Sequence, residues 1–196
     1  MKKILFIFLF TNLIYGQEIA KKPFKIKPEI GLSITTQVFQ GNNYLSKGHK
    51  NPSFGGELKL NLVHYNNFKL GGTLEKSTLK VSDFSIGGNS DKTNINSASV
   101  ILSYQFQMTN KLNLIPQVSY GGVELRQKNG SKLFGVQNGS KIGLSVNGKY
   151  KLSTHFSILT NVGYNKYLLN VNTTSEFQEY FNNTSSINYS LGLSFN

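Results

Sequence analysis

Strict alternation of apolar and polar residues is the feature of this sequence that most constrains its fold. Residues 187–195, at the C-terminus, show it without a break, because every second residue is apolar and those between are small or polar. The apolar positions are Ile187, Tyr189, Leu191, Leu193 and Phe195. Side chains of a β-strand alternate between its two faces, so this period of two predicts a strand with one apolar and one polar face.

The same alternation recurs in seven earlier segments, which begin near residues 28, 54, 68, 98, 112, 142 and 156. Residues 40–53, 82–93, 126–138 and 170–185 are mostly polar or glycine and predict long loops, whereas residues 65–67, 109–111 and 152–155 predict short turns. Eight strands joined alternately by long loops and short turns predict an all-β fold, an antiparallel up-and-down transmembrane β-barrel. Closure of such a barrel requires the last strand to pair with the first, around Ile30 to Val38.

Two features of the sequence depart from a regular barrel. Leu79 and Val81 follow Leu70 and Leu74 in the opposite phase. This change indicates either a β-bulge near residues 76–78 or a strand that continues past the edge of the bilayer. Pro116 lies inside the fifth segment and has no N–H for the ladder, so we expect an irregularity beside it.

The N-terminus predicts export. Residues 1–16 combine Lys2 and Lys3, an apolar run and a small Gly16, which is the pattern of a cleaved secretory signal peptide. We expect residues 17–25 to form a short periplasmic lead-in and residues 26–196 to form the barrel. The chain has no cysteine, which excludes disulfides and thiolate metal sites.

Residues 26–196 resemble the small eight-stranded outer-membrane β-barrel proteins of the OmpA and OmpX type. The resemblance rests on the pattern of strands and loops, on the signal peptide and on the terminal strand. The Lys- and Asn-rich composition looks like that of exported proteins of the Bacteroidetes group. The resemblance implies a place in the outer membrane of a Gram-negative bacterium, with both termini in the periplasm and with outer-membrane lipid and lipopolysaccharide around the barrel. It also implies that the barrel-insertion machinery reads the last strand as an assembly signal. That signal ends on a Phe in the family, whereas here Asn196 follows Phe195.

Twelve aromatic residues lie near the ends of the expected strands, where they would form the interfacial girdles of a membrane barrel. They are Phe39, Phe54, Tyr65, Phe68, Phe106, Tyr120, Tyr150, Phe156, Tyr164, Tyr167, Tyr189 and Phe195.

Seven charged residues fall on the polar faces of the expected strands. They are Glu29, Glu57, Lys59, Lys69, Glu75, Lys141 and Lys149. An eight-stranded barrel encloses only enough space for its own side chains. Because charges away from water need partners, we expect these residues to pair across the lumen and plug it. A narrow ion path through them is the alternative.

No motif predicts an enzyme, a cofactor or a metal site. His155 and Ser157 have the spacing of the His-x-Ser pair of lipid A deacylases, but they fall in an expected periplasmic turn. His49 and His64 have no second ligand at metal-binding spacing. The net charge of +12 is not gathered into a basic run, so no nucleic-acid partner is expected.

Two roles for such a barrel remain open, a structural role in the envelope and the binding of an extracellular ligand or surface partner through the long loops. In the fourth loop, Phe177, Tyr180 and Phe181 are expected to be exposed and are the candidate contact site. Loop lysines would neutralise lipopolysaccharide phosphates. A soluble lipocalin-like binder is the alternative fold. It would place the apolar faces inside, around a ligand, and periodicity alone does not distinguish inside from outside.

Overall fold

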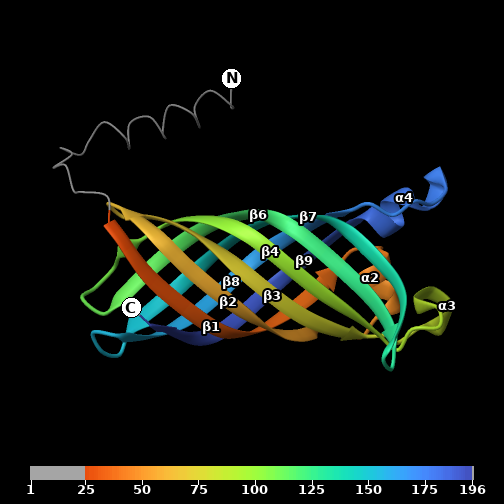
Figure 1. Cartoon of the computed structure of the whole chain (residues 1–196), viewed down its shortest axis with the longest axis horizontal. Coiled ribbons are helices and arrows are strands. Elements are labelled where there is room, and N and C mark those ends of the chain that lie inside the picture. Colours follow the sequence, from red (N-terminus) through yellow and green to blue (C-terminus); the bar gives the residue numbers. More distant parts are fainter. Residues whose placement is uncertain (1–24, 196) are drawn as a thin grey trace, which may run out of the picture.

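The chain forms one closed antiparallel β-barrel, shown in Figure 1. The structure is a computed structural model that describes residues 25–195, so the expected signal peptide at 1–16 lies outside the described residues. Its strands are β1 (Lys25–Gln40), β2 (Ser53–Tyr65), β3 (Phe68–Lys80), β4 (Lys92–Tyr104), β5 (Phe106–Gln107), β6 (Leu112–Asn129), β7 (Lys132–Lys151), β8 (Phe156–Leu169) and β9 (Asn183–Phe195). Its helices are α2 (Tyr44–Gly48), α3 (Phe84–Gly87) and α4 (Ser175–Asn182). None of these helices is long and apolar enough to cross a membrane.

The barrel has eight strands, as the alternation predicted, because β4 and β5 together form one of them. Both pair with β6 in a single register, from Ser103 opposite Gln117 to Phe106 opposite Leu114. The two residue pairs between these positions, at Pro116 and Ile115 of β6, are missing from the ladder. This gap confirms the irregularity expected beside Pro116. The interruption lies in the neighbouring strand, since Pro116 keeps its place opposite Val146 on β7.

Closure occurs where the sequence predicted it, between the first and the last strand. Ile30 lies opposite Phe195 and Val38 lies opposite Ile187 in an unbroken antiparallel register. The start of β1 and the end of β9 therefore lie at one end of the barrel, which we call the terminal end. The helices α2, α3 and α4 lie at the opposite end, which we call the loop end (Figure 1).

The polar faces of the strands point inward and the apolar faces point outward. Ile34, Val100 and Leu191, for example, have exposed fractions of 74%, 61% and 62%, whereas Lys141 and Asn113 inside are 2% and 1% exposed. This polarity is the opposite of what a lipocalin-like binder of an apolar ligand requires. The soluble alternative is therefore not favoured.

The third connection is a β-hairpin, so the prediction of a long loop at residues 126–138 is wrong. Strands β6 and β7 pair up to Asn129 and Lys132, and Gly130 takes the turn with a φ of 57°. A left-handed φ suits glycine, which has no Cβ to clash with the backbone. The sequence did not indicate the hairpin because residues 126–132 are all polar or glycine, and Leu133 and Phe134 are adjacent, so the alternation that marks a strand is missing.

Strand β3 also continues without a bulge at residues 76–78, so of the two explanations for the change of phase the bulge is wrong. Its pairing with β4 is regular up to Lys80 opposite Lys92. Leu79 points inward like Ser77, and it is fully buried. The phase of the apolar residues changes because the interior of the barrel turns from polar to apolar at the loop end.

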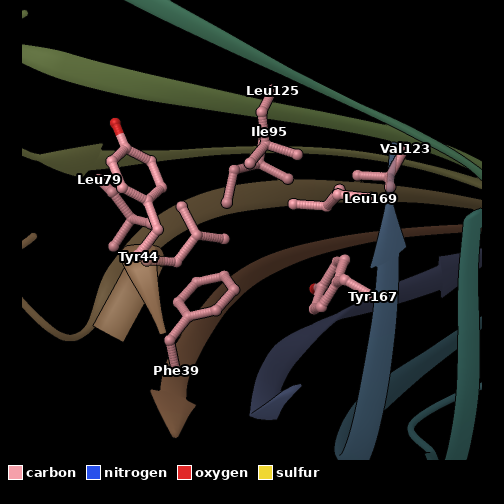
Figure 2. Packing of buried hydrophobic residues seen from close by; sticks show 9 residues of the cluster. Phe39, Tyr44, Leu79, Ile95, Val123, Leu125, Tyr167 and Leu169 are labelled. Carbon is pink, nitrogen blue, oxygen red and sulfur yellow. The ribbon is translucent and has the colours of Figure 1, made fainter. Parts of the chain in front are cut away.

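An apolar cluster fills the loop end of the barrel and is shown in Figure 2. We call this set the mouth cluster, and it comprises Phe39, Tyr44, Leu45, Leu79, Ile95, Val123, Leu125, Tyr167 and Leu169. Phe39 and Tyr167 lie inside it with ring centroids 5.7 Å apart, so their assignment to the outer aromatic girdle is wrong. Both occupy inward positions of their strands. The other ten expected girdle residues are exposed on the outer surface.

Removing a side chain of the mouth cluster is expected to destabilise the barrel more than the same change on its outer surface. Leu125→Ala leaves a cavity among packed side chains and should lower the free energy of unfolding by about 2–5 kcal/mol. Leu144→Ala is the matched control, since Leu144 is 59% exposed on the outer face. Urea unfolding of the chain refolded into lipid vesicles measures both changes. Equal losses for the two variants would contradict the packing of the mouth.

Candidate functional site: the barrel lumen and the outer rim

The lumen near the terminal end is organised by one carboxylate between two ammonium groups. Glu29 of β1 accepts from Lys69 Nζ of β3 at 2.8 Å, and its other oxygen lies 2.9 Å from Lys149 Nζ of β7. All three side chains are nearly inaccessible to solvent. Buried charges are tolerated only when they are paired and hydrogen-bonded. The three residues therefore depend on one another.

The middle of the lumen is crossed by a chain of amide hydrogen bonds. Lys59 Nζ donates to Asn147 Oδ1 at 2.8 Å and lies 3.7 Å from Glu57. Asn161 donates to the same oxygen of Asn147 at 3.0 Å, and Asn188 donates to Asn161 at 2.8 Å. Strands β2, β7, β8 and β9 are thus tied together across the barrel.

Closer to the mouth cluster, Lys141 of β7 pairs with Glu75 of β3 and also donates to Ser97 Oγ at 3.1 Å. Glu57 lies directly opposite Glu75 in the pair of strands β2 and β3. The free volume among these side chains is about 10 Å³, which is roughly room for one water molecule. At this level, side chains fill the lumen.

The structure brings all seven of the expected lumen residues into the interior, in the three groups described above. The mouth cluster lies beyond them, so an ionic and polar layer is followed by an apolar layer on the way to the loop end. The sequence indicated the charged faces but not the apolar layer. The one indication of the apolar layer in the sequence was the change of phase of the apolar residues at Leu79.

The expected contact site in the fourth loop lies on α4, but only part of it is exposed. Phe177 is 49% exposed, whereas Tyr180 and Phe181 pack against the mouth cluster and the Phe181 ring lies 5.4 Å from that of Tyr44. The expectation that these three are all exposed is therefore wrong. This segment is also not alone in exposing loop aromatics, since Phe84 of α3 and Phe134 of the β6–β7 hairpin are 67% and 46% exposed.

The structure does not bring the histidines into a reactive arrangement. His155 lies exposed in a turn, where its ring contacts the Thr154 hydroxyl, while Ser157 points into the lumen. His49 is buried under α2, and its Nε2 lies 2.7 Å from Thr93 Oγ1. Burial lowers the pKa of His49 below its usual range. No group of three or more potential metal ligands occurs among residues 25–195.

A row of three lysines on the outer surface was missed by the sequence analysis. Lys80 lies directly opposite Lys92, and Lys92 lies directly opposite Lys128, on the adjacent strands β3, β4 and β6. Leu79 and Thr93, next to Lys80 and Lys92, are fully buried. Gln127, next to Lys128, donates to the Tyr44 hydroxyl in the mouth cluster at 2.8 Å, so all three lysines face outward. The register of the hairpin creates the row. A long loop at 126–138 would have left Lys128 unplaced.

The lysine row, as we call Lys80, Lys92 and Lys128, has no acidic partner among the described ion pairs. Like charges directly opposite each other on a sheet are destabilising, with Cβ atoms roughly 5 Å apart. Glu124, which lies further from the loop end on β6, forms an ion pair with Arg126, and its Oε1 lies 2.6 Å from Arg126 Nε. The Asp91 carboxylate accepts from the Gly130 backbone at 3.2 Å. The row therefore presents uncompensated positive charge at the loop end.

A hollow of about 540 Å³ lies on the outer surface below the lysine row. Small residues create it, since Ala98 and Gly122 face each other on β4 and β6. A Cβ added at Gly122 would meet no atom within 4 Å. Leu74, Asn96 and Glu124 line the same hollow, so the apolar depression continues upward past the Glu124–Arg126 pair to the lysine row.

Removing the Glu29 carboxylate is expected to destabilise the barrel strongly. Glu29→Gln leaves Lys69 and Lys149 buried without their counter-charge and should cost about 3–5 kcal/mol. Adding Lys149→Met should recover part of this loss, because it removes one uncompensated charge. Glu124→Gln breaks an exposed pair and serves as the control, with little change expected. Urea unfolding of refolded protein measures all four chains, and an E29Q variant as stable as the control would contradict the pairing.

The fold was compared with those of known proteins. No family model matches this chain, and no curated protein matches its sequence. Among solved structures, neisserial surface protein A (NspA) is similar with a TM-score of 0.66 at 10% identity, over 89% of this chain and 99% of that one. Ail, the attachment invasion locus protein of Yersinia pestis, matches with a TM-score of 0.50 at 11% identity, over 86% and 95%. OprG of Pseudomonas aeruginosa matches with a TM-score of 0.50 at 12% identity, over 86% and 94%.

These three structures share little sequence with this chain, so the similarity concerns the fold. It agrees with the closed eight-stranded ladder, the polar interior and the apolar exterior. The chain has the fold of the small eight-stranded outer-membrane β-barrels of the OmpA and OmpX type.

Proposed function

We propose that this protein resides in the outer membrane of a Gram-negative bacterium as a non-enzymatic barrel that contributes to envelope integrity and presents its loop end outside the cell. One observation carries the proposal. Every barrel strand presents apolar side chains outward, around an interior of paired charges and hydrogen-bonded amides. In water, that surface would be a continuous apolar patch, whereas in hydrocarbon it matches its surroundings.

The proposed orientation is supported by the difference between the two ends of the barrel. An even number of strands puts both termini at one end, and an exported chain reaches the outer membrane from the periplasm. The terminal end then faces the periplasm, and its short turns match the short periplasmic turns of bacterial outer-membrane barrels. The loop end, with α2, α3, α4 and the β6–β7 hairpin, then faces outward.

The lumen is proposed to be plugged rather than conducting. Support comes from the ionic groups around Glu29 and Glu75, the roughly single-water volume between them and the apolar mouth cluster beyond. An ion crossing the barrel would have to displace paired buried charges and then pass through an apolar layer. A narrow channel would require both layers to move.

A non-enzymatic role is supported by the arrangement of the reactive side chains. The ring of His155 and the hydroxyl of Ser157 lie in different surroundings, one in a solvent-exposed turn and the other in the lumen. General base catalysis requires the base within hydrogen-bond reach of the group it activates. A lipid A-modifying reaction on this pair is therefore not favoured.

The loop end is proposed to bind outward-facing partners. The lysine row supplies point charges for the phosphates of lipopolysaccharide, and the hollow beneath it suits an acyl chain. Phe177, with Tyr180 and Phe181 as its packed support on α4, is the candidate contact for a surface partner.

The last strand is proposed to be the signal that the insertion machinery reads. Tyr189, Leu191, Leu193 and Phe195 are exposed on its outer face, and Ile187 occupies the same face nearer the loop end. The Phe195 ring packs edge-on against Phe156 with centroids 5.1 Å apart. The terminal aromatic residue thus also anchors the closing pair of strands to β8.

Phe195→Ala is expected to reduce assembly in the outer membrane while leaving export intact, because it removes the terminal aromatic side chain of the signal. Phe177→Ala, an equal truncation of an exposed ring on α4, is the control and should assemble normally. Cell fractionation and heat-modifiable gel mobility measure the folded membrane-bound fraction. Recovery of the wild-type chain from the soluble periplasm without detergent would overturn the membrane location. Normal amounts of folded F195A would contradict the signal.

Replacing the lysine row is expected to weaken binding of phosphorylated lipid. Each lysine near an anionic surface contributes about 1 kcal/mol, so K80Q/K92Q/K128Q should bind lipid A bisphosphate about 100-fold more weakly than wild type. K47Q/K111Q/K166Q removes the same charge elsewhere and should retain most of the affinity. Native mass spectrometry of the folded barrel in detergent, titrated with the lipid, measures both. Equal affinities of the two triple variants would contradict a role for the row.

A further inference from the structure

The terminal end contains a pocket that the proposed function leaves unused. Its volume is about 190 Å³, and residues from β1, β2, β3, β6 and β7 line it. Glu29, Lys69 and Lys149 form its inner wall. Beyond that wall, the lumen is filled as far as the mouth cluster. The pocket is therefore blind, open only at the terminal end, and we call it the vestibule.

The vestibule carries far more positive than negative charge. Lys27, Lys69, Lys149 and Lys151 line it, and Glu29 is the one carboxylate among the lining residues. Both oxygens of Glu29 are already engaged, one by Lys69 and the other by Lys149. None of the described ion pairs includes Lys27 or Lys151. Two ammonium groups at the open end thus have no carboxylate partner among residues 25–195.

A buried hydrogen-bond donor points to the same kind of ligand. Asn113 lines the vestibule and is 1% exposed. Its Oδ1 accepts from Gln105 Nε2 at 3.0 Å, while its Nδ2 has no partner among the described residues. An amide nitrogen only donates, so it suits an acceptor and cannot ligate a cation. Nε2 of His64, on the same lining, is likewise buried and has no hydrogen-bond partner among residues 25–195.

From this arrangement we propose that the vestibule binds a small, doubly charged oxyanion such as inorganic phosphate. Ammonium groups would supply the charge, and the Asn113 amide would supply a directed hydrogen bond to one oxygen. The volume of about 190 Å³ is ample for one tetrahedral anion together with several water molecules. The assignment of this end to the periplasm rests on the proposed orientation, but binding itself does not.

The test uses the full-length chain folded in detergent micelles, titrated calorimetrically with inorganic phosphate and with sulfate at constant ionic strength, chloride replacing the oxyanion. Wild-type protein is expected to bind one phosphate or sulfate per barrel and to unfold at a higher temperature in their presence, because a ligand that binds only the folded state stabilises it. Chloride at the same ionic strength should give neither effect.

Two variants locate the site. K27Q/K151Q removes the two lysines at the open end that have no carboxylate partner and should weaken phosphate binding by about tenfold or more. K47Q/K166Q removes equal charge away from the vestibule, since Lys47 lies on α2 at the loop end and neither residue lines the pocket, and it should bind as wild type does. Asn113→Asp places a carboxylate where the anion would sit and should abolish binding. K27Q/K151Q changes only rim residues, so it remains informative if N113D fails to fold.

No saturable heat with phosphate or sulfate, or equal loss in K27Q/K151Q and K47Q/K166Q, would overturn the proposal. Heat-modifiable mobility of each variant reports the folded barrel independently. A barrel that folds and resides in the membrane but ignores phosphate would remove the vestibule site and leave the proposed function standing.

Discussion

The pairing of β1 with β9 is the interaction on which the rest of the structure depends. A sheet with two open edges would leave two rows of backbone N–H and C=O groups without partners, and in hydrocarbon each such group costs several kcal/mol. The register from Ile30 opposite Phe195 to Val38 opposite Ile187 removes both edges. It also fixes which face of every strand lies inside, because side chains alternate strictly along a strand. A slip of one residue would turn Leu191 inward and Ser190 outward.

Closure creates an interior that must be filled, and the chain fills it in layers of different chemistry. Near the terminal end the filling is ionic around Glu29, in the middle it is amide around Asn147 and Asn161, and at the loop end it is apolar around Leu79 and Leu125. The ionic groups hold strands far apart in sequence, such as β1 and β7, in one place. The apolar layer needs no hydrogen bonds, which suits the end where irregular loops fold inward over the barrel.

Much of this fold could be predicted from the sequence because strand alternation is a local property. The strand count, the closing pair and the inward charges from Glu29 to Lys149 all follow from a period of two. The predictions that were wrong concern properties that depend on the position of a residue along the barrel axis. Phe39 and Tyr167 were assigned to the outer girdles because they lie near strand ends, and only the apolar layer explains their burial. The lysine row and the vestibule arise from registers between strands, which periodicity within one strand does not contain.

The β6–β7 hairpin has a consequence for how the molecule meets its neighbours. Strands β6 and β7 have 18 and 20 residues, against 13 in β3 and β4, so the wall of the barrel rises higher on one side. The lysine row and the hollow at Gly122 lie on or next to this taller wall. A barrel of even height would have no side distinguished by its shape. This one has a front and a back, and its rotation about its own axis decides which neighbours face the basic surface.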